Sequence, residues 1–438
     1  MSAIDTWVAQ FDAQAPRLPG AGLPWLAALR RRAIERFADQ GWPTRRHPNW
    51  QHTSLAFMEQ QSFAAPIDAT DPAALLARAK AEDAGKGHWL AFVGGRFNAG
   101  LSTIGPLPAR ACIGSLADAL AGGDDAIEAV FGSAEDGDSP AAMNAAFAGD
   151  GAWIRLARGV VVEDPIHLVF LSGPGDATRH LRNLVVADAG ARATIVEHYP
   201  QGGEAATLTT ATTRIEAGAD AHVTHVKLQQ EAEPAIHLAT IDALQARGSV
   251  FASHSLSFGA RLARNDIRTR FDGEGCETLF NGLYHADGRR HVDHQTRIDH
   301  AQPRGTSREF YRGLLDGTAR GVFAGRIVVA QDAQRSDAMQ RCDNLLLSRQ
   351  AEADARPELE IYADDVKCAH GATVGQIDDE SLFYLRSRGL DETHARQLLT
   401  YAFAAEALAR IDLVPLRNRA RAALLARLPG GKILEELL

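Results

Sequence analysis

The stretch "GARATIVEHY", residues 190–199, opens with a glycine and continues as a short run of strand-forming residues. The pattern returns three times, as "GADAHVTHVK" (218–227), "GSVFASHSLS" (248–257) and "GCETLFNGLY" (275–284). The leading glycines, at positions 190, 218, 248 and 275, are separated by steps of 28, 30 and 27. A unit of this length, made of short strands and turns, is typical of a β-helix, in which one or two turns of a coil repeat. Residues one repeat apart would then lie on neighbouring turns. A β-sandwich with similar strand spacing is the alternative.

Around this repeat the chain divides into three regions. Residues 150–374 alternate in polarity or run in β-branched residues between Gly and Asp turns, and we expect them to form a β-helix core. Residues 1–149 are expected to form an N-terminal helical and mixed region. Within it, the segment 23–43 has apolar residues three and four apart and ends at Gly41 and Pro43. The apolar positions are Leu26, Leu29, Ala33, Ile34 and Phe37.

Residues 375–438 are expected to form a C-terminal helical region. One helix begins at Asp378 or Asp379 as its N-cap and ends at Gly389, and a second follows from Asp391. The second helix places apolar residues on one stripe, namely Leu398, Leu399, Ala402, Phe403 and Leu408. Such a stripe is suited either to docking another subunit or to packing on the strand region.

Composition excludes several classes of function. The chain has 438 residues and a net charge of -9, from 46 basic and 55 acidic residues, which opposes binding to nucleic acid. There is neither a secretory signal nor a run of 18 apolar residues, so we expect no membrane contact and a cytoplasmic protein. No GxxxxGK[ST] loop for nucleotide phosphates is present. The four cysteines form no CxxC pair, so a metal cluster would need ligands from elsewhere, including another chain.

The segment "YADDVKCAHGATVGQ" (362–376) is the main candidate site. If it is a strand, Cys368 and His370, two positions apart, project from the same face. A thiol and an imidazole on one face are consistent with half of a metal site, with a nucleophile and its base, or with inert strand residues. The step from Cys342 to His370 is 28, which matches the repeat. The repeat therefore predicts that Cys342 lies one coil from His370 and that three soft ligands converge on one face.

Two other groups of polar residues are weaker candidates. The segment "YHADGRRHVDHQTRIDH" (284–300) contains four histidines, but His291 and His294 differ in parity, so a regular strand would point them to opposite faces. We interpret them as solvated or hydrogen-bonded strand residues. Asp364 and Asp365 invite comparison with β-helix enzymes that act on polysaccharides, yet adjacent strand residues also face opposite ways.

Four longer segments carry a resemblance to a known family. They are 41–55, "GWPTRRHPNWQHTSL"; 143–168, "MNAAFAGDGAWIRLARGVVVEDPIHL"; 291–334, "HVDHQTRIDHAQPRGTSREFYRGLLDGTARGVFAGRIVVAQDAQ"; and 356–390, "RPELEIYADDVKCAHGATVGQIDDESLFYLRSRGL". They resemble the SufB/SufD family of iron-sulfur cluster assembly scaffolds, in its SufD branch. The resemblance spans nearly the whole chain.

The resemblance implies a mainly β fold, a right-handed parallel β-helix core flanked by N-terminal and C-terminal α-helical regions. It also implies a non-catalytic scaffold that pairs with SufB and docks the ATPase SufC, which would carry the ATP. No tightly bound cofactor is expected, only a transient iron-sulfur cluster within the complex. The resemblance leaves open whether the isolated chain is a monomer or a homodimer. The alternatives are a β-helix carbohydrate-active enzyme and a stand-alone β-helix binding module.

By the same resemblance, His370 lies at the cluster-building interface with SufB, and Cys368 is a weaker ligand candidate. Cys342 departs from the SufD pattern, which usually has a polar residue there, and "CDNLL" (342–346) is similar to the SufB segment that holds a cluster-building cysteine. Cys342 is therefore a third candidate. The expected SufC-binding residues are Phe383, Tyr384, Leu385, Arg386, Arg388 and Gly389.

Overall fold

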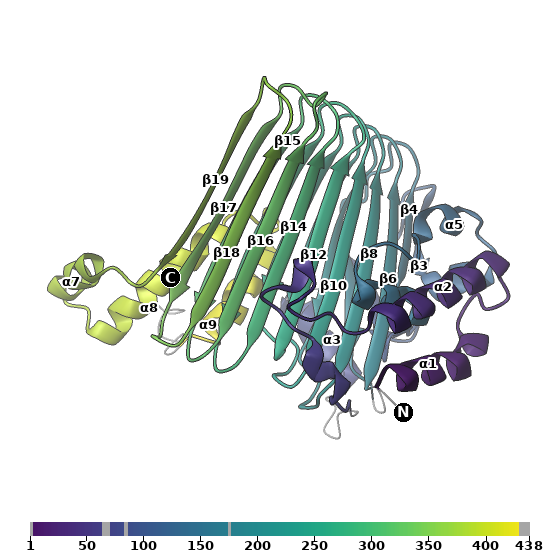
Figure 1. Cartoon of the computed structure of the whole chain (residues 1–438), viewed down its shortest axis with the longest axis horizontal. Coiled ribbons are helices and arrows are strands. Elements are labelled where there is room, and N and C mark those ends of the chain that lie inside the picture. The colour runs from purple at the N-terminus through teal and green to yellow at the C-terminus, as the bar shows by residue number, and fades with distance from the viewer. Residues whose placement is uncertain (1–2, 64–70, 83–85, 174–176, 429–438) are drawn as a thin grey trace.

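The computed structural model describes residues 3–63, 71–82, 86–173 and 177–428. In this part of the chain the strands form two sheets, one of 10 strands and one of nine, which face each other as a flattened coil (Figure 1). From residue 152 onward, successive strands alternate between the sheets, so each turn of the coil adds one strand to each sheet. The expected parallel β-helix is therefore confirmed, and the sandwich alternative is wrong.

The larger sheet has the strand order β19-β17-β15-β13-β11-β9-β7-β5-β1-β2. Its strands are β1 (His88–Val93), β2 (Arg96–Phe97), β5 (Ile166–Leu171), β7 (Arg192–Tyr199), β9 (His222–Gln229), β11 (Val250–Ser257), β13 (Glu277–Ala286), β15 (Thr306–Leu315), β17 (Asp337–Leu346) and β19 (Lys367–Gly375). The smaller sheet has the order β18-β16-β14-β12-β10-β8-β6-β4-β3. Its strands are β3 (Ala111–Ser115), β4 (Ala152–Leu156), β6 (Thr178–Ala187), β8 (Leu208–Ala217), β10 (Ile236–Gln245), β12 (Leu262–Phe271), β14 (His291–His300), β16 (Arg320–Val329) and β18 (Glu352–Ile361).

The length of each coil follows from the strand register. Arg192 is paired with His222, and the same position continues through Val250, Glu277, Thr306, Asp337 and Lys367. The numbers of these paired residues rise in steps of 30, 28, 27, 29, 31 and 30. The repeat in the sequence is therefore the coil itself, although the coil length is not constant.

A column of left-handed turn residues stacks along one edge of the coil. Its members have φ between 57° and 72° and are Gly159, Gly190, Asp220, Gly248, Gly275, Arg304 and Arg335. Each donates its backbone N–H to a carbonyl of the next coil, over 2.6–3.0 Å. Three of the four glycines of the sequence repeat belong to this column. Gly218 does not, because Asp220 takes the left-handed position in that coil.

The hydrophobic core lies between the two sheets, where alternate residues of each strand point inward. Ile298 and Ile327, for example, are paired in register and fully buried, as is Phe271 in the coil before. Burial of such apolar ladders removes a continuous column of surface from water and stabilises the stack of coils.

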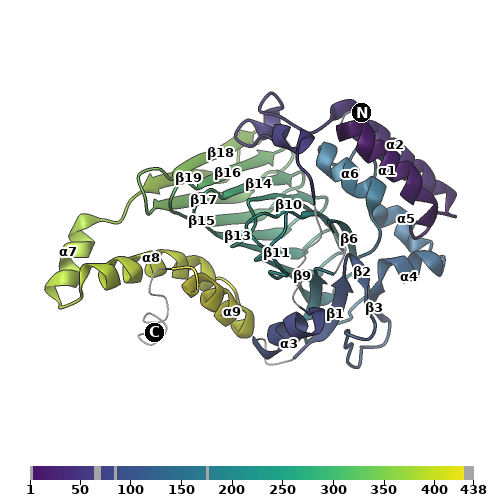
Figure 2. The same ribbon diagram turned by 90° about the horizontal axis from the view of Figure 1, so that it is seen from below.

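Helices cover the outer faces of both sheets. α1 (Ala3–Gln14), α2 (Pro24–Gln40) and α6 (Ser139–Phe147) pack on the smaller sheet, whereas α3 (Pro72–Glu82), α8 (Glu392–Leu408) and α9 (Val414–Leu425) pack on the larger one (Figure 2). The apolar residues predicted to face the core from segment 23–43 are all buried. The remaining helices are η1 (Ala15–Arg17), η2 (Pro48–Trp50), η3 (Ala56–Glu59), α4 (Leu116–Ala121), α5 (Ala126–Phe131) and α7 (Asp379–Ser387).

The two ends of the coil differ. At the N-terminal end, β2 and β3 pair antiparallel with β1 and β4 and close the stack. At the other end, β18 and β19 are the outermost strands, and no further strand of the described chain pairs with their outer edges. β1, β2 and β3 come from the region 1–149, and β19 ends at Gly375, where the region 375–438 was expected to begin. Residues 429–438 of that region lie outside the described residues. Within the described chain, no helix is both long and apolar enough to cross a membrane.

Candidate functional site

The terminal strand β19 carries the candidate residues. It runs from Lys367 to Gly375 and continues without a break through Gly371. Asp364 and Asp365 precede it and lie in the turn after β18, where the parity argument for a regular strand does not apply. One edge of β19 pairs in parallel with β17, and in the described chain the other edge has no partner strand.

Cys368 and His370 lie on the same side of β19, as expected from their spacing. In the register with β17 they oppose Ala338 and Gln340, which are both buried and face the interior of the coil. Because β19 is the last strand, this inward side is uncovered at His370, which is exposed. Cys368 is partly buried against the core, and burial raises the pKa of its thiol. His370 is therefore accessible to a second chain that approaches the uncovered side of β19.

Cys342 lies on the neighbouring coil, as expected, but two residues out of register with His370. The register of the last coil places His370 opposite Gln340, whereas Cys342 lies opposite Ala372. Cys342 is fully buried, and burial raises the pKa of its thiol to about 12. In the described chain no three His, Cys, Asp or Glu side chains are grouped to hold a metal ion. The predicted convergence of Cys342, Cys368 and His370 is thus not formed within one chain.

Two buried polar residues lie behind His370. Glu309, Gln340 and His370 occupy the same register position on β15, β17 and β19. Gln340 Nε2 donates to a carboxylate oxygen of Glu309, and burial raises the pKa of Glu309 to about 7. A Cβ at Gly325 would come within 2.1 Å of Gln340 Nε2, so a side chain there would collide with the amide. The sequence analysis missed this pair because it used a coil length of 28 residues before His370. A coil length of 30 residues places Gln340 opposite His370.

Apolar side chains surround the open end. Val374 on β19 is 48% exposed, and Ile361 and Tyr362, at the end of β18, are 41% and 63% exposed. Together with the unpaired backbone groups of both edge strands, they form a surface that we call the open end, defined by β18, β19 and Tyr362. Edge strands of this kind are normally covered in native proteins.

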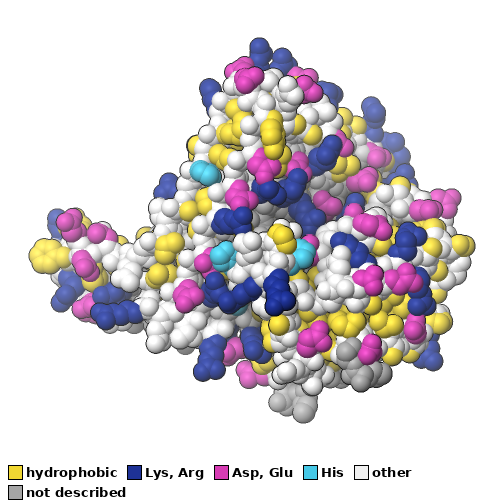
Figure 3. All heavy atoms as spheres, viewed as in Figure 1, with side chains coloured by type: hydrophobic (Ala, Val, Ile, Leu, Met, Phe, Trp, Pro, Cys, Tyr) yellow, Lys and Arg dark blue, Asp and Glu magenta, His cyan; other side chains and the backbone are white. Residues whose placement is uncertain are grey.

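The helix α7 is a second candidate surface. It projects away from the sheets, and Figure 3 shows apolar side chains at the tip of this lobe. Asp378 caps its N-terminus by accepting from the Ser381 N–H, and Gly389, with φ of 98°, follows its C-terminus, both as expected. Phe383 and Tyr384 are 73% and 57% exposed. Of the other predicted partner-binding residues, Arg386, Arg388 and Gly389 are exposed and Leu385 is half-buried.

Two histidines of segment 284–300 form hydrogen bonds within the protein. His291 faces outward, where its Nε2 lies 2.8 Å from Thr53 Oγ1. His294 faces the interior, with its Nε2 3.2 Å from Ser255 Oγ. The prediction that these two residues point to opposite faces and form hydrogen bonds is confirmed.

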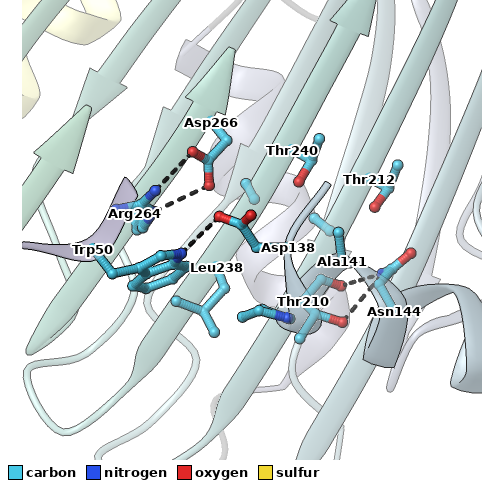
Figure 4. Close-up of a pocket in the computed structure, with 13 residues that line it drawn as sticks. Trp50, Asp138, Ala141, Asn144, Thr210, Thr212, Leu238, Thr240, Arg264 and Asp266 are labelled. Atoms are coloured by element: carbon cyan, nitrogen blue, oxygen red, sulfur yellow. Dashed lines mark hydrogen bonds and ion pairs between the residues drawn. The ribbon is translucent and has the colours of Figure 1, made fainter. Parts of the chain in front are cut away.

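A small pocket on the outer face of the smaller sheet is filled by the protein's own contacts (Figure 4). The Arg264 guanidinium lies 3.7 Å from the centre of the Trp50 ring and forms an ion pair with Asp266. Trp50 Nε1 donates to Asp138 over 2.7 Å. These contacts hold the N-terminal segment on the sheet.

Comparison with known proteins gives a consistent result over nearly the whole chain. The family model of the SUF system FeS cluster assembly SufBD core domain matches residues 170–403, and that of the SufBD protein N-terminal region matches residues 1–168. The iron-sulfur cluster assembly protein SufD of Escherichia coli is 33% identical over 98% of both chains. A SufBD family protein of Synechocystis is 31% identical over 86% of both chains.

Proposed function

The chain belongs to the SufBD family and is a SufD-like iron-sulfur cluster assembly protein of the SUF system, and from this we propose that it is a non-catalytic scaffold subunit. In this proposal its open end pairs with SufB, and α7 docks the ATPase SufC. The complex acts in the cytoplasm. Iron and sulfide are the cargo of the complex and are held only while a cluster is built.

The observation that carries the proposal is the exposure of His370 on an uncovered edge strand. An imidazole is a suitable ligand for iron, and Cys368 on the same side supplies a second soft donor. Among the described residues neither side chain belongs to a group that could hold a metal ion, so the remaining ligands would come from SufB. An edge strand also supplies backbone N–H and C=O groups to which a partner strand can pair.

The exposed aromatic side chains of α7 support its role as the SufC dock. Phe383 and Tyr384 are large apolar groups that the chain itself leaves in water. Aromatic residues of this kind frequently dominate the binding energy of protein interfaces. ATP hydrolysis on SufC would then move the C-terminal helices and open the interface at which His370 lies. In this proposal Cys342 binds iron only if its buried thiol becomes exposed.

Family membership over nearly the whole chain favours this scaffold over a carbohydrate-active enzyme or a stand-alone binding module. The test is co-expression with SufB and SufC, followed by anaerobic purification of the wild type and of His370→Ala. We expect the variant complex to form with unchanged stoichiometry and to lose most of its visible cluster absorbance, because a ligand is removed from an exposed position.

The matched control is His222→Ala, which removes a half-buried imidazole from β9, near the middle of the same sheet. It should leave both the complex and the cluster unchanged. Normal cluster absorbance in the His370→Ala complex would rule out the proposed role of His370.

A further inference from the structure

Asp343 on β17 is a buried carboxylate that connects three strands of the larger sheet. Only 2% of its side chain is exposed. Arg312 Nη1 on β15 lies 3.0 Å from its Oδ2, and Arg341 Nε lies 2.7 Å from the same oxygen. On the other side, Thr373 Oγ1 on β19 donates to Oδ1 over 2.5 Å. Both carboxylate oxygens are thus engaged, one by cations and one by the terminal strand.

Arg312 links this carboxylate to the C-terminal helices. Its Nη2 forms an ion pair with Glu406 on α8, and its side chain is 9% exposed. The guanidinium lies 4.9 Å and 4.5 Å from the ring centres of Phe310 and Phe403, and contact with both rings restricts it. An arginine held in this way cannot follow Glu406 without changing its distance to Asp343.

The contacts Glu406–Arg312–Asp343–Thr373 therefore run without a gap from α8 to β19. The Thr373 bond fastens β19 to the sheet through a side chain, in addition to the backbone ladder with β17. Thr373 lies on the same strand as His370. A buried carboxylate that loses a cation must find new partners, because the unpaired charge is costly. Rearrangement of Asp343 would release Thr373 first, since this bond lies nearest the open end.

We propose that Asp343 is a positioning residue that couples α8 to β19, so that displacement of the C-terminal helices loosens the strand that carries His370. The use of this coupling rests on the proposed function, in which SufC moves these helices. The coupling itself is a property of this chain alone and can be measured without SufB, SufC or iron.

The test is hydrogen exchange measured by mass spectrometry on the isolated full-length chain. Glu406→Gln removes the charge that anchors Arg312. Glu406 is 48% exposed, so the variant should fold. We expect the β19 amides that bond to β17 to exchange roughly fivefold faster, as when one charge-assisted hydrogen bond is weakened, although Glu406 does not contact β19. Glu392→Gln is the control, because Glu392 lies on the same helix but pairs only with Arg386 and Arg396 among the described residues.

A second pair of variants isolates the last contact. Thr373→Val should accelerate exchange in β19 by itself and abolish any further effect of Glu406→Gln there, whereas Thr373→Ser should restore the wild-type rates. The proposal is overturned if Glu406→Gln accelerates exchange in α8 but leaves β19 unchanged, or if its effect on β19 persists in Thr373→Val. Because these rates do not depend on cluster assembly, a failed His370 experiment would leave this result intact, and the reverse also holds.

Discussion

Two buried carboxyl groups near the terminal coil have different neighbours. Asp343 has two arginines beside it, with nitrogens 3.0 Å and 2.7 Å from its Oδ2. Glu309 receives a hydrogen bond from Gln340 but has no cation beside it among the ion pairs of the described chain. Burial therefore raises the pKa of Glu309 to about 7, and the native state retains its proton at a pH where an exposed glutamate has lost it.

Glu309 makes a prediction about stability and pH. Between pH 4.5, the ordinary pKa of the group, and about 7, the native state binds a proton that the unfolded chain has released. The free energy of unfolding therefore falls as pH rises through this window and levels above it. Glu309→Gln has no titrating group at this position, so it does not share the wild-type loss of stability. The free energy of unfolding of the variant, relative to wild type, should therefore increase by about 1–3 kcal/mol between pH 5 and about 8. Denaturant unfolding at both pH values measures the difference.

The control for this prediction is Glu352→Gln, which neutralises a carboxylate that is 70% exposed on β18. It should not change the pH dependence. A constant difference between Glu309→Gln and wild type across the window would show that Glu309 is ionised in the folded protein.

At the scale of the elements, glycines of the coil serve two different purposes. Gly275 has φ of 71° and open space where a Cβ would be, so it is needed only for its backbone conformation. Gly218 has no left-handed φ, but a Cβ there would lie 2.7 Å from the Ala189 nitrogen of the neighbouring coil. The repeat in the sequence therefore combines a turn requirement with a requirement for close approach.

Alanine substitutions should separate these two purposes. Gly275→Ala forces an alanine into the left-handed conformation, which costs about 1 kcal/mol of unfolding free energy. Gly218→Ala should cost more, roughly 2–4 kcal/mol, because the methyl group meets backbone that cannot rotate away. Urea unfolding of both variants measures the costs. Equal losses would mean that the neighbouring coils separate easily.

The hydrophobic pattern alone did not predict which face of α8 packs on the sheet. The expected stripe was Leu398, Leu399, Ala402, Phe403 and Leu408, of which only Leu408 is fully buried. The buried residues are mostly small, including Ala395, Ala404 and Ala407, because the helix lies close to the larger sheet. The larger apolar residues lie at the sides of the contact. Hydrophobic spacing was compatible with both faces, and the approach of helix to sheet selected one.

At the scale of the whole molecule, the open end and α7 are separate surfaces (Figure 1). We expect Val374→Lys, which places a charge on the uncovered edge of β19, to weaken binding of SufB at least about tenfold and to leave SufC bound. The double variant Phe383→Ala, Tyr384→Ala should show the reverse, because each aromatic contributes roughly 1–2 kcal/mol of binding. All three side chains are exposed, so thermal stability should not change. Co-purification of tagged variants measures both effects, and each variant is the control for the other.

Loss of both partners from either variant would contradict this separation. In that case the two surfaces would form one continuous interface, or binding at one would require occupancy of the other.

The sequence by itself determined the features that depend on neighbours along the chain. The strand region, the existence of a repeating coil, the caps of α7 and the common side of Cys368 and His370 all follow from local spacing and turn chemistry. Only the tertiary structure decided that Gln340 and not Cys342 opposes His370, that Cys342 is buried, and that the last coil is left uncovered. The physical reason is that each turn can gain or lose a residue without disturbing its own strands. Such a change shifts the register of the next coil, and burial depends on what that coil then contacts.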